Sequence, residues 1–234
     1  MQCDIQKMLQ RQFYFFGTYF MEEAILDRWT TYAGESEVVF DIGANAGIYS
    51  LAAAAANPQA TVNAFEPTPQ VASHLRSTVS TNSLSDRIRV HELAVGAVSG
   101  TAALNFFSGE RDDNEGMNFV SATGVAVKSC PIAVVSLDDF CRRRGIERLD
   151  LVKIDVQGAE ADVLTGAANL LSNQALGTLF LELNWSEGEK CSATRVIELL
   201  RKAGYQFTDP RGARDPQPAG PWLRSLTDVI AITQ

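Results

Sequence analysis

The chain has 234 residues, of which 46% are hydrophobic and 21% charged, the composition of a folded globular protein rather than a disordered or fibrous one. Its 20 basic and 28 acidic residues give a formal net charge of −8, which argues against a nucleic-acid partner. The aromatic run at residues 13–21 is too short to cross a bilayer, and residues 1–12 lack the apolar core of a signal peptide. Four widely spaced cysteines without a C-x-x-C pair indicate reduced thiols in a cytoplasmic protein.

The segment before the first predicted strand is expected to be helical. Phe16, Phe20 and Trp29 keep roughly to one helical face. We therefore divide the chain into an N-terminal helical extension over residues 1–36 and a main domain over residues 37–234. Two roles fit the extension equally well, a lid over a ligand pocket and a cover for the edge of the sheet.

Residues 38–47, with the sequence VVFDIGANAG, predict a buried strand and a glycine-rich turn, and the alanine run at residues 52–56 predicts a following helix. A strand, a tight turn and a helix N-terminus surround a cavity that suits a small polar ligand. A dinucleotide fingerprint needs G-x-G-x-x-G, but Asn45 and Ile48 stand at its second and third glycine positions. Asn tolerates the left-handed backbone that such a turn requires.

The charge of Asp41 indicates which ligand this turn binds. A carboxylate here would repel a pyrophosphate but would hold an ammonium group through a charge-assisted hydrogen bond. S-adenosylmethionine carries an ammonium, a sulfonium and one carboxylate, so the charge pattern favours it over NAD. Glu66 follows the second strand, predicted at residues 61–65, and is placed to accept hydrogen bonds from both ribose hydroxyls. NAD sites use a similar acid, so Glu66 indicates adenosine rather than the whole cofactor.

The next part of the chain is less regular. Residues 68–80 predict a helix and residues 87–93 a third strand. The loop after a third strand borders the adenine in this kind of fold, which makes Ala94 and Val95 cofactor candidates. Two strand-like runs flanking a polar segment then predict a hairpin insertion around residues 101–135, whose polar tip is expected to contact the substrate.

Two later strands carry acids near their carboxyl ends. Residues 149–154 predict a fourth strand that Asp155 closes, and residues 179–183 predict a fifth strand that contains Glu182. Lys153 is unusual in a central strand. Because side chains alternate along a strand, Lys153 shares a face with Asp155, which predicts an ion pair between them.

Alternating strands and helices indicate an α/β fold with a mostly parallel central sheet and helices on both faces. Two closing strands, at residues 205–208 and 228–232, are joined by a turn-rich loop and indicate an antiparallel edge. Ligands in such sheets bind beyond the carboxyl ends of the strands. Four acids are expected at that edge: Asp41, Glu66, Asp155 and Glu182.

Four motifs together resemble the FkbM-type methyltransferases: FDIGANAG at residues 40–47, AFEP at 64–67, VSLDDF at 135–140 and DLVKIDVQGAE at 150–160. The resemblance implies a Rossmann-like class I methyltransferase fold that uses S-adenosylmethionine, usually to methylate a hydroxyl on a sugar or a secondary metabolite. It also implies that Asp155 lies near the transferred methyl group. It implies cofactor-binding roles for Asp41, Gly43, Asn45, Gly47 and Glu66.

Methyl transfer to an alcohol needs an aligned donor and acceptor and a base that takes the proton of the alcohol. Asp155 is the first candidate for this base and Glu182 the second. One residue departs from the family pattern, because Gln157 stands where the family often has Glu, and that puts any binding role of the Glu in doubt. In an alternative reading, Asp155, Glu182 and Asn184 resemble the Mg²⁺ ligands of catechol-type methyltransferases.

Two further function classes stay open at this point. An NAD-dependent oxidoreductase would use a related sheet, although the broken glycine pattern and Asp41 speak against it. A non-catalytic descendant would bind S-adenosylmethionine without yielding a methylated product. The acceptor is expected to be a small molecule or a saccharide, no nucleic acid or membrane span is expected, and a homo-oligomer is left open.

Overall fold

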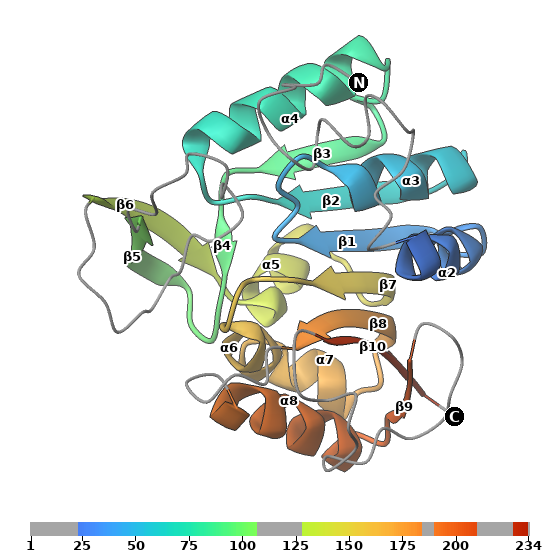
Figure 1. Ribbon diagram of the computed structural model, residues 1–234, viewed down its shortest axis with the longest axis vertical. Helices are drawn as coiled ribbons and strands as arrows, with labels where there is room; N and C mark the ends of the chain where they lie inside the picture. The colour runs from blue at the N-terminus through green and yellow to red at the C-terminus, as the bar shows by residue number, and fades with distance from the viewer. Residues whose placement is uncertain (1–22, 107–127, 184–189, 210–226, 234) are drawn as a thin grey trace.

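The computed structural model describes residues 23–106, 128–183, 190–209 and 227–233, and a seven-stranded sheet forms its centre (Figure 1). The first five strands in sheet order are parallel to one another, and the sixth is antiparallel to both of its neighbours. This is the mostly parallel sheet with an antiparallel edge that the sequence predicts. In sheet order the strands are β3 (Ile88–His91), β2 (Thr61–Phe65), β1 (Val38–Ile42), β7 (Leu149–Ile154), β8 (Leu176–Leu183), β10 (Thr227–Ile232) and β9 (Gln206–Thr208).

Helices cover both faces of this sheet, as predicted. Side chains alternate along β1, so that Val39 packs into the hydrophobic cluster on one face and Phe40 into the cluster on the other. The first cluster contains residues of α2 (Glu23–Ala33), α3 (Ile48–Ala56) and α4 (Pro69–Thr81). The second contains residues of α5 (Leu137–Arg144), α6 (Glu160–Thr165), α7 (Ala168–Ser172) and α8 (Lys190–Lys202).

The chain changes direction across the sheet between β1 and β7. From β1 it runs outward through β2 to β3, and it later enters β7 on the other side of β1 and continues to β8 (Figure 1). The arrowheads of these parallel strands lie at one edge of the sheet. In open α/β sheets, ligands bind at this edge and at the point where the strand order reverses. The turn after β1 and the loop after β7 therefore frame the candidate site.

A smaller three-stranded sheet lies beside the main one, with the order β4 (Ala94–Val95), β6 (Lys128–Val135) and β5 (Gly100–Phe106). β5 and β6 are antiparallel, whereas β4 is parallel to β6. β5 and β6 fall where the sequence predicts the hairpin insertion, whereas β4 precedes it. The predicted polar tip lies outside the described residues, and the division of the chain into an extension and a main domain stays a prediction.

Helix α2 packs directly onto the sheet. Trp29 is fully buried, and its indole N–H donates to the carbonyl oxygen of Tyr49 at 2.9 Å. Its ring meets the ring of Phe180 edge-on, with the ring centroids 5.2 Å apart. This part of the predicted extension covers the sheet, and the remainder, residues 1–22, lies outside the described part of the chain. Within the described segments, no helix has both the length and the hydrophobicity needed to cross a bilayer.

The sequence predicts one helix over residues 158–168, but the structure has two short helices, α6 and α7, separated at Gly166. A Cβ atom at Gly166 would lie 2.1 Å from the carbonyl oxygen of Gly96. The backbone just after β4 thus lies so close to the junction of α6 and α7 that only glycine fits at position 166. A contact between segments so distant in sequence leaves no local pattern, which is why the break was not predicted.

Candidate active site

The turn after β1 has the left-handed backbone that the sequence predicts. Gly43, Asn45 and Gly47 have φ values of 83°, 47° and 82°. A Cβ atom at Gly43 would lie 1.9 Å from the carbonyl oxygen of Asp155, and one at Gly47 would lie 2.2 Å from a methyl carbon of Leu75. The two glycines therefore let the turn pack tightly against the loop after β7 and against α4.

Asp41 is the last residue but one of β1, and only 1% of its surface is exposed. Its Oδ2 accepts hydrogen bonds from the backbone N–H of Ser50 at 2.9 Å and from the Ser50 hydroxyl at 2.6 Å. Burial raises the pKa of Asp41, although the positive charge of Lys153 acts in the opposite direction. Its Oδ1 is buried and has no hydrogen-bond donor among the described residues. A buried carboxyl oxygen without a donor fits a ligand that carries an N–H group.

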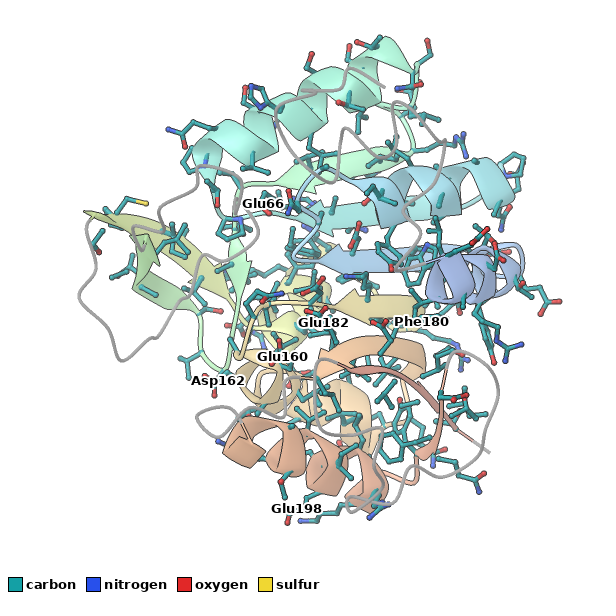
Figure 2. The ribbon with its side chains drawn as sticks, viewed as in Figure 1. Glu66, Glu160, Asp162, Phe180, Glu182 and Glu198 are labelled. Atoms are coloured by element: carbon teal, nitrogen blue, oxygen red, sulfur yellow. The ribbon has the colours of Figure 1, made fainter. Side chains whose placement is uncertain are left out.

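Glu66 follows β2 directly and connects the ends of two strands. Its Oε2 accepts from the backbone N–H of Asn45 at 3.0 Å, and its Oε1 accepts from the backbone N–H of Thr68 at 2.8 Å. The side chain is almost fully buried, and burial raises its pKa. Each carboxylate oxygen has a second lone pair that can accept from a ligand hydroxyl. Figure 2 shows Glu66 at the same edge of the sheet as Glu182.

A polar cluster lies at the ends of β7 and β8. The ammonium of Lys153 lies 2.6 Å from Oδ2 of Asp155, which confirms the predicted ion pair, and 4.4 Å from the centre of the Tyr49 ring. The side-chain amide nitrogen of Gln157 donates to Oδ1 of Asp155 at 2.8 Å and to Oε2 of Glu182 at 2.9 Å. Gln157 thus bridges Asp155 and Glu182, the two acids predicted from the sequence as candidate bases.

The two acids of this cluster have opposite pKa shifts. Burial favours a higher pKa for Asp155, but the charge and hydrogen bond of Lys153 and the hydrogen bond from Gln157 outweigh it and hold the pKa below its ordinary value. Burial, followed by the negative charge of Asp155, raises the pKa of Glu182 to about 8. Near neutral pH the pair therefore holds one negative charge on Asp155 and one proton on Glu182.

The loop that carries Gln157 has an unusual backbone that is held from the following helix. Gln157 has a φ of 53°, a left-handed conformation that is uncommon for a residue other than glycine. Oε1 of Glu160 accepts from the backbone N–H groups of Val156 at 3.2 Å and Gly158 at 3.0 Å. Glu160 is 3% exposed, so these two hydrogen bonds are internal to the fold. Backbone strain of this kind gathers at functional sites.

Comparison with known proteins identifies the family. The methyltransferase FkbM domain matches residues 41–207, a span that begins at Asp41, ends in β9 and contains every acid described above. The chain belongs to the FkbM methyltransferase family. The resemblance carried by the four sequence motifs is thereby confirmed, and with it the assignment as a methyltransferase.

Two relatives of this FkbM-family chain have established names. It is 31% identical to the 2-O-methyltransferase NoeI of Sinorhizobium fredii, over 75% of each chain. It is 32% identical to the 31-O-demethyl-FK506 methyltransferase FkbM of Streptomyces tacrolimicus, over 79% of this chain and 77% of that one. The fold is similar to that of an O-methyltransferase from Bacillus cereus solved in complex with SAH, with a TM-score of 0.54 at 14% identity, covering 93% of this chain and 82% of that one. The Rossmann-like class I methyltransferase fold is thus confirmed.

Two of the predicted cofactor residues in this FkbM-family chain lie in hydrophobic surroundings. Ala94 and Val95 form β4, where they pair with Val134 and Val135 of β6. Both are buried, Ala94 among residues of the smaller sheet and Val95 in the main core. Their contact with a cofactor stays a prediction.

A metal centre finds limited support in the described residues. In residues 23–106, 128–183, 190–209 and 227–233, no three His, Cys, Asp or Glu side chains are grouped so that they could hold a metal ion. Asp155 and Glu182 are close together, but they are joined by the amide of Gln157. Asn184, the third ligand in the Mg²⁺ alternative, lies outside the described residues.

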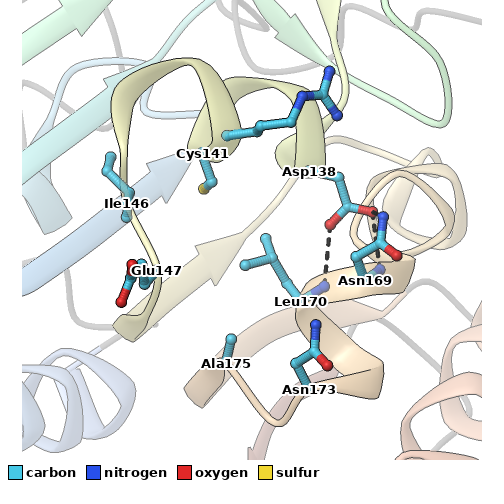
Figure 3. A pocket seen from close by; sticks show the side chains of 9 residues that line it. Asp138, Cys141, Ile146, Glu147, Asn169, Leu170, Asn173 and Ala175 are labelled. Atoms are coloured by element: carbon cyan, nitrogen blue, oxygen red, sulfur yellow. Dashed lines mark hydrogen bonds between the residues drawn. The ribbon is translucent and has the colours of Figure 1, made fainter.

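A second pair of acids, Asp138 and Asp139, stabilises the start of α5 and the neighbouring α7. Ser136 caps α5 by accepting from the backbone N–H of Asp139. Asp138 accepts from the backbone N–H groups of Asn169 at 2.9 Å and Leu170 at 3.1 Å, beside a small cavity of about 220 Å³ (Figure 3). These hydrogen bonds are all internal to the fold.

Neither the contacts of Gln157 nor the role of Glu160 was predicted from the sequence. A signal for Gln157 was present, because it lies two residues after Asp155 in the motif at residues 150–160. The two histidines lie in different surroundings. His74 is exposed on α4, and His91 lies 2.9 Å from Oδ1 of Asn63, with a pKa that burial lowers to about 4.

Proposed function

We propose that this FkbM-family chain transfers a methyl group from S-adenosylmethionine to a hydroxyl oxygen on a sugar or a secondary metabolite. The observation that carries the proposal is the buried Oδ1 of Asp41, which has no donor in the described part of the chain. The ammonium group of S-adenosylmethionine supplies an N–H donor and a positive charge for this position. NAD would instead bring a pyrophosphate, whose negative charge Asp41 would repel.

The turn and the second strand supply the other cofactor contacts in this proposal. Gly43, Asn45 and Gly47 shape the turn by their left-handed backbone and their close packing. Glu66 accepts hydrogen bonds from the two ribose hydroxyls through its remaining lone pairs. Ala94 and Val95 are proposed to border the adenine.

S-adenosylmethionine supplies an activated methyl group, and the acids after β7 and in β8 supply the base. Asp155 is ionised near neutral pH and accepts the proton of the acceptor hydroxyl as the new bond forms. Glu182 is the second candidate, and its proton makes it a base only at higher pH. The names of two relatives, a 2-O-methyltransferase and a 31-O-demethyl-FK506 methyltransferase, support an oxygen acceptor.

Calorimetric titration with S-adenosylmethionine, its demethylated product SAH and NAD tests the cofactor assignment. We expect the first two to bind and NAD not to bind. Binding of NAD alone would favour the oxidoreductase alternative and overturn the proposal.

The acceptor can be found by incubating the protein and S-adenosylmethionine carrying a deuterated methyl group with a metabolite extract. Mass spectrometry should then detect compounds that gain one deuterated methyl group only when the protein is present. Binding of S-adenosylmethionine without any labelled product would indicate the binding-only alternative. Repeating the reaction in EDTA tests the Mg²⁺ alternative, which requires that turnover be lost and then restored by Mg²⁺.

A further inference from the structure

The amide of Gln157 lies between the two acids that are proposed to handle the proton. We propose that Gln157 is a positioning residue that holds Asp155 and Glu182 together as one hydrogen-bonded pair, through the two N–H bonds of its amide. The proposal rests on the function proposed above, because it names the residue that positions the two acids of that function. The contacts themselves are 2.8 Å to Asp155 and 2.9 Å to Glu182.

A glutamine amide can make both contacts at this position, whereas a glutamate cannot. The NH₂ group of glutamine has two hydrogens, so it can donate one to each carboxyl group. An ionised glutamate has no hydrogen to donate, and a protonated one has a single hydrogen. A glutamate at this position would therefore place a third acid against two others. Gln157 replaces that repulsion with two attractive contacts.

The backbone holds the amide in place. Gln157 has a left-handed φ of 53°, and the backbone N–H groups on both sides of it, those of Val156 and Gly158, donate to Glu160. A strained conformation persists only where the surroundings fix it. Here the fixing group is a buried carboxyl at the start of α6. The loop therefore presents the side chain of Gln157 to the two acids in one defined position.

Each of the two carboxylate oxygens of Asp155 has its own donor. Lys153 donates to Oδ2 of Asp155 and so leaves Oδ1 for Gln157. Burial and the negative charge of Asp155 raise the pKa of Glu182, so Glu182 is the protonated partner. Gln157 thus stabilises the charge on Asp155 while it keeps Glu182 within reach. The charged groups that act on this pair from neighbouring elements are Lys153 on β7, Asp41 on β1, Asp228 on β10 and Glu160 on α6.

The test is a pH titration of side-chain carboxyl carbons by ¹³C NMR in the full chain, which requires neither cofactor nor acceptor. In Gln157→Glu, the cluster gains a third acid between two others, so one more carboxyl group than in the unmodified protein should titrate above pH 6. The matched control is Gln174→Glu, because Gln174 is also left-handed, with a φ of 52°, but is exposed in the turn after α7. Its new carboxyl group should titrate near the ordinary value of about 4.3.

Gln157→Asn provides a neutral second variant. Asparagine tolerates a left-handed backbone but is one methylene shorter, so its amide cannot reach both acids. The titration assigned to Glu182, identified by its loss in Glu182→Gln, should move to higher pH by about half a unit to one unit, because the doubly ionised pair loses a donor. The amide NMR spectrum reports whether each variant is folded.

The outcomes separate this inference from the proposed function. If the new carboxyl group of Gln157→Glu titrates like that of Gln174→Glu, or if Gln157→Asn leaves the titration of Glu182 unchanged, the bridging role of Gln157 is overturned. A protein that fails to bind S-adenosylmethionine overturns the proposed function instead. The NMR titrations still report on the bridge in that case.

Discussion

Two pairs of acids in this chain, Asp138 with Asp139 and Asp155 with Glu182, have opposite surroundings. At the start of α5, Asp138 accepts from backbone N–H groups of α7, and Asp139 accepts from the hydroxyl of Ser99 and from Arg142. The hydrogen bond from Ser99, followed by the one from Arg142, lowers the pKa of Asp139. At the end of β7, Asp155 and Glu182 instead both accept from the amide of Gln157, and burial, followed by the charge of Asp155, raises the pKa of Glu182 to about 8.

The difference shows how to separate structural acids from chemical ones. In the first pair, the carboxylate oxygens accept from helix N–H groups, a hydroxyl and an arginine, and these contacts stabilise the fold. Two carboxyl groups in contact cannot both be ionised without a penalty, so they retain a proton near neutral pH. The member of such a pair that stays ionised, here Asp155, can accept the proton of an alcohol. The contact partners of an acid, rather than its presence at a strand or helix end, thus indicate its role.

The strongest test of this distinction is Asp155→Asn, which removes the ionised member of the second pair. Loss of the general base should lower kcat by about 10²- to 10⁴-fold while the affinity for S-adenosylmethionine is retained. The measurement is methyl transfer to the acceptor found by mass spectrometry, combined with calorimetric binding of the cofactor. Asp162→Asn is the matched control, because Asp162 is exposed on α6 nearby. Full turnover by Asp155→Asn would reject Asp155 as the base.

A second variant, Asp41→Asn, tests the acid that belongs to neither pair. The asparagine oxygen can still accept from Ser50, but its NH₂ group would then occupy the place of Oδ1 and oppose the ammonium of the cofactor. Losing a charged hydrogen bond of about 1.5–3 kcal/mol should weaken S-adenosylmethionine binding by about 10- to 100-fold. Calorimetry gives the dissociation constant, with the exposed Asp86→Asn as control. Unchanged affinity would contradict the role of Asp41.

The sequence predicts the positions of these acids better than it predicts their partners. Strands β2 and β7 have the predicted bounds, because apolar runs and strand-end acids are local signals. The ion pair of Lys153 was also predictable, since it depends only on the two-residue repeat. The end of β1 at Ile42 is harder to predict, because a strand's last residue depends on pairing with its neighbours.

Long-range contacts account for what local sequence patterns did not predict. The bridge from Gln157 to Glu182 spans 25 positions in the chain, so no local spacing predicts it. The break between α6 and α7 likewise depends on the approach of Gly96, which comes 70 positions earlier than Gly166. Local patterns therefore located the candidate site, whereas the contacts that set its chemistry depend on the tertiary fold.

The proton on Glu182 predicts a pH-dependent difference in stability. Because the pKa is raised from 4.5 to about 8, the folded state holds a proton between these pH values that the unfolded state has lost. The contribution of Glu182 to stability is therefore fully present below pH 4.5 and is lost as pH rises through 8. Glu182→Gln cannot ionise, so its Tm should equal that of the unmodified protein at about pH 5 and exceed it by a few degrees at about pH 9.

Thermal melts at both pH values measure this effect, with Glu198→Gln on the exposed surface of α8 as control. The control should show the same small offset at both pH values. A Glu182→Gln variant whose offset stays constant across this pH range would mean that Glu182 titrates normally. The contrast between the two acid pairs would then no longer hold.

The smallest expected effect belongs to the structural pair. Asp138→Ala leaves the backbone N–H groups of Asn169 and Leu170 without their acceptor, which should cost about 1 kcal/mol of folding free energy, as does the loss of a helix cap. Urea unfolding measures this loss, and Asp86→Ala, which changes an exposed acid, serves as control. Cofactor affinity should not change, because the hydrogen bonds of Asp138 go to α7 rather than to the edge where Asp41 and Glu66 lie. A large loss of affinity at normal stability would mean that the α5 acids belong to the active site after all.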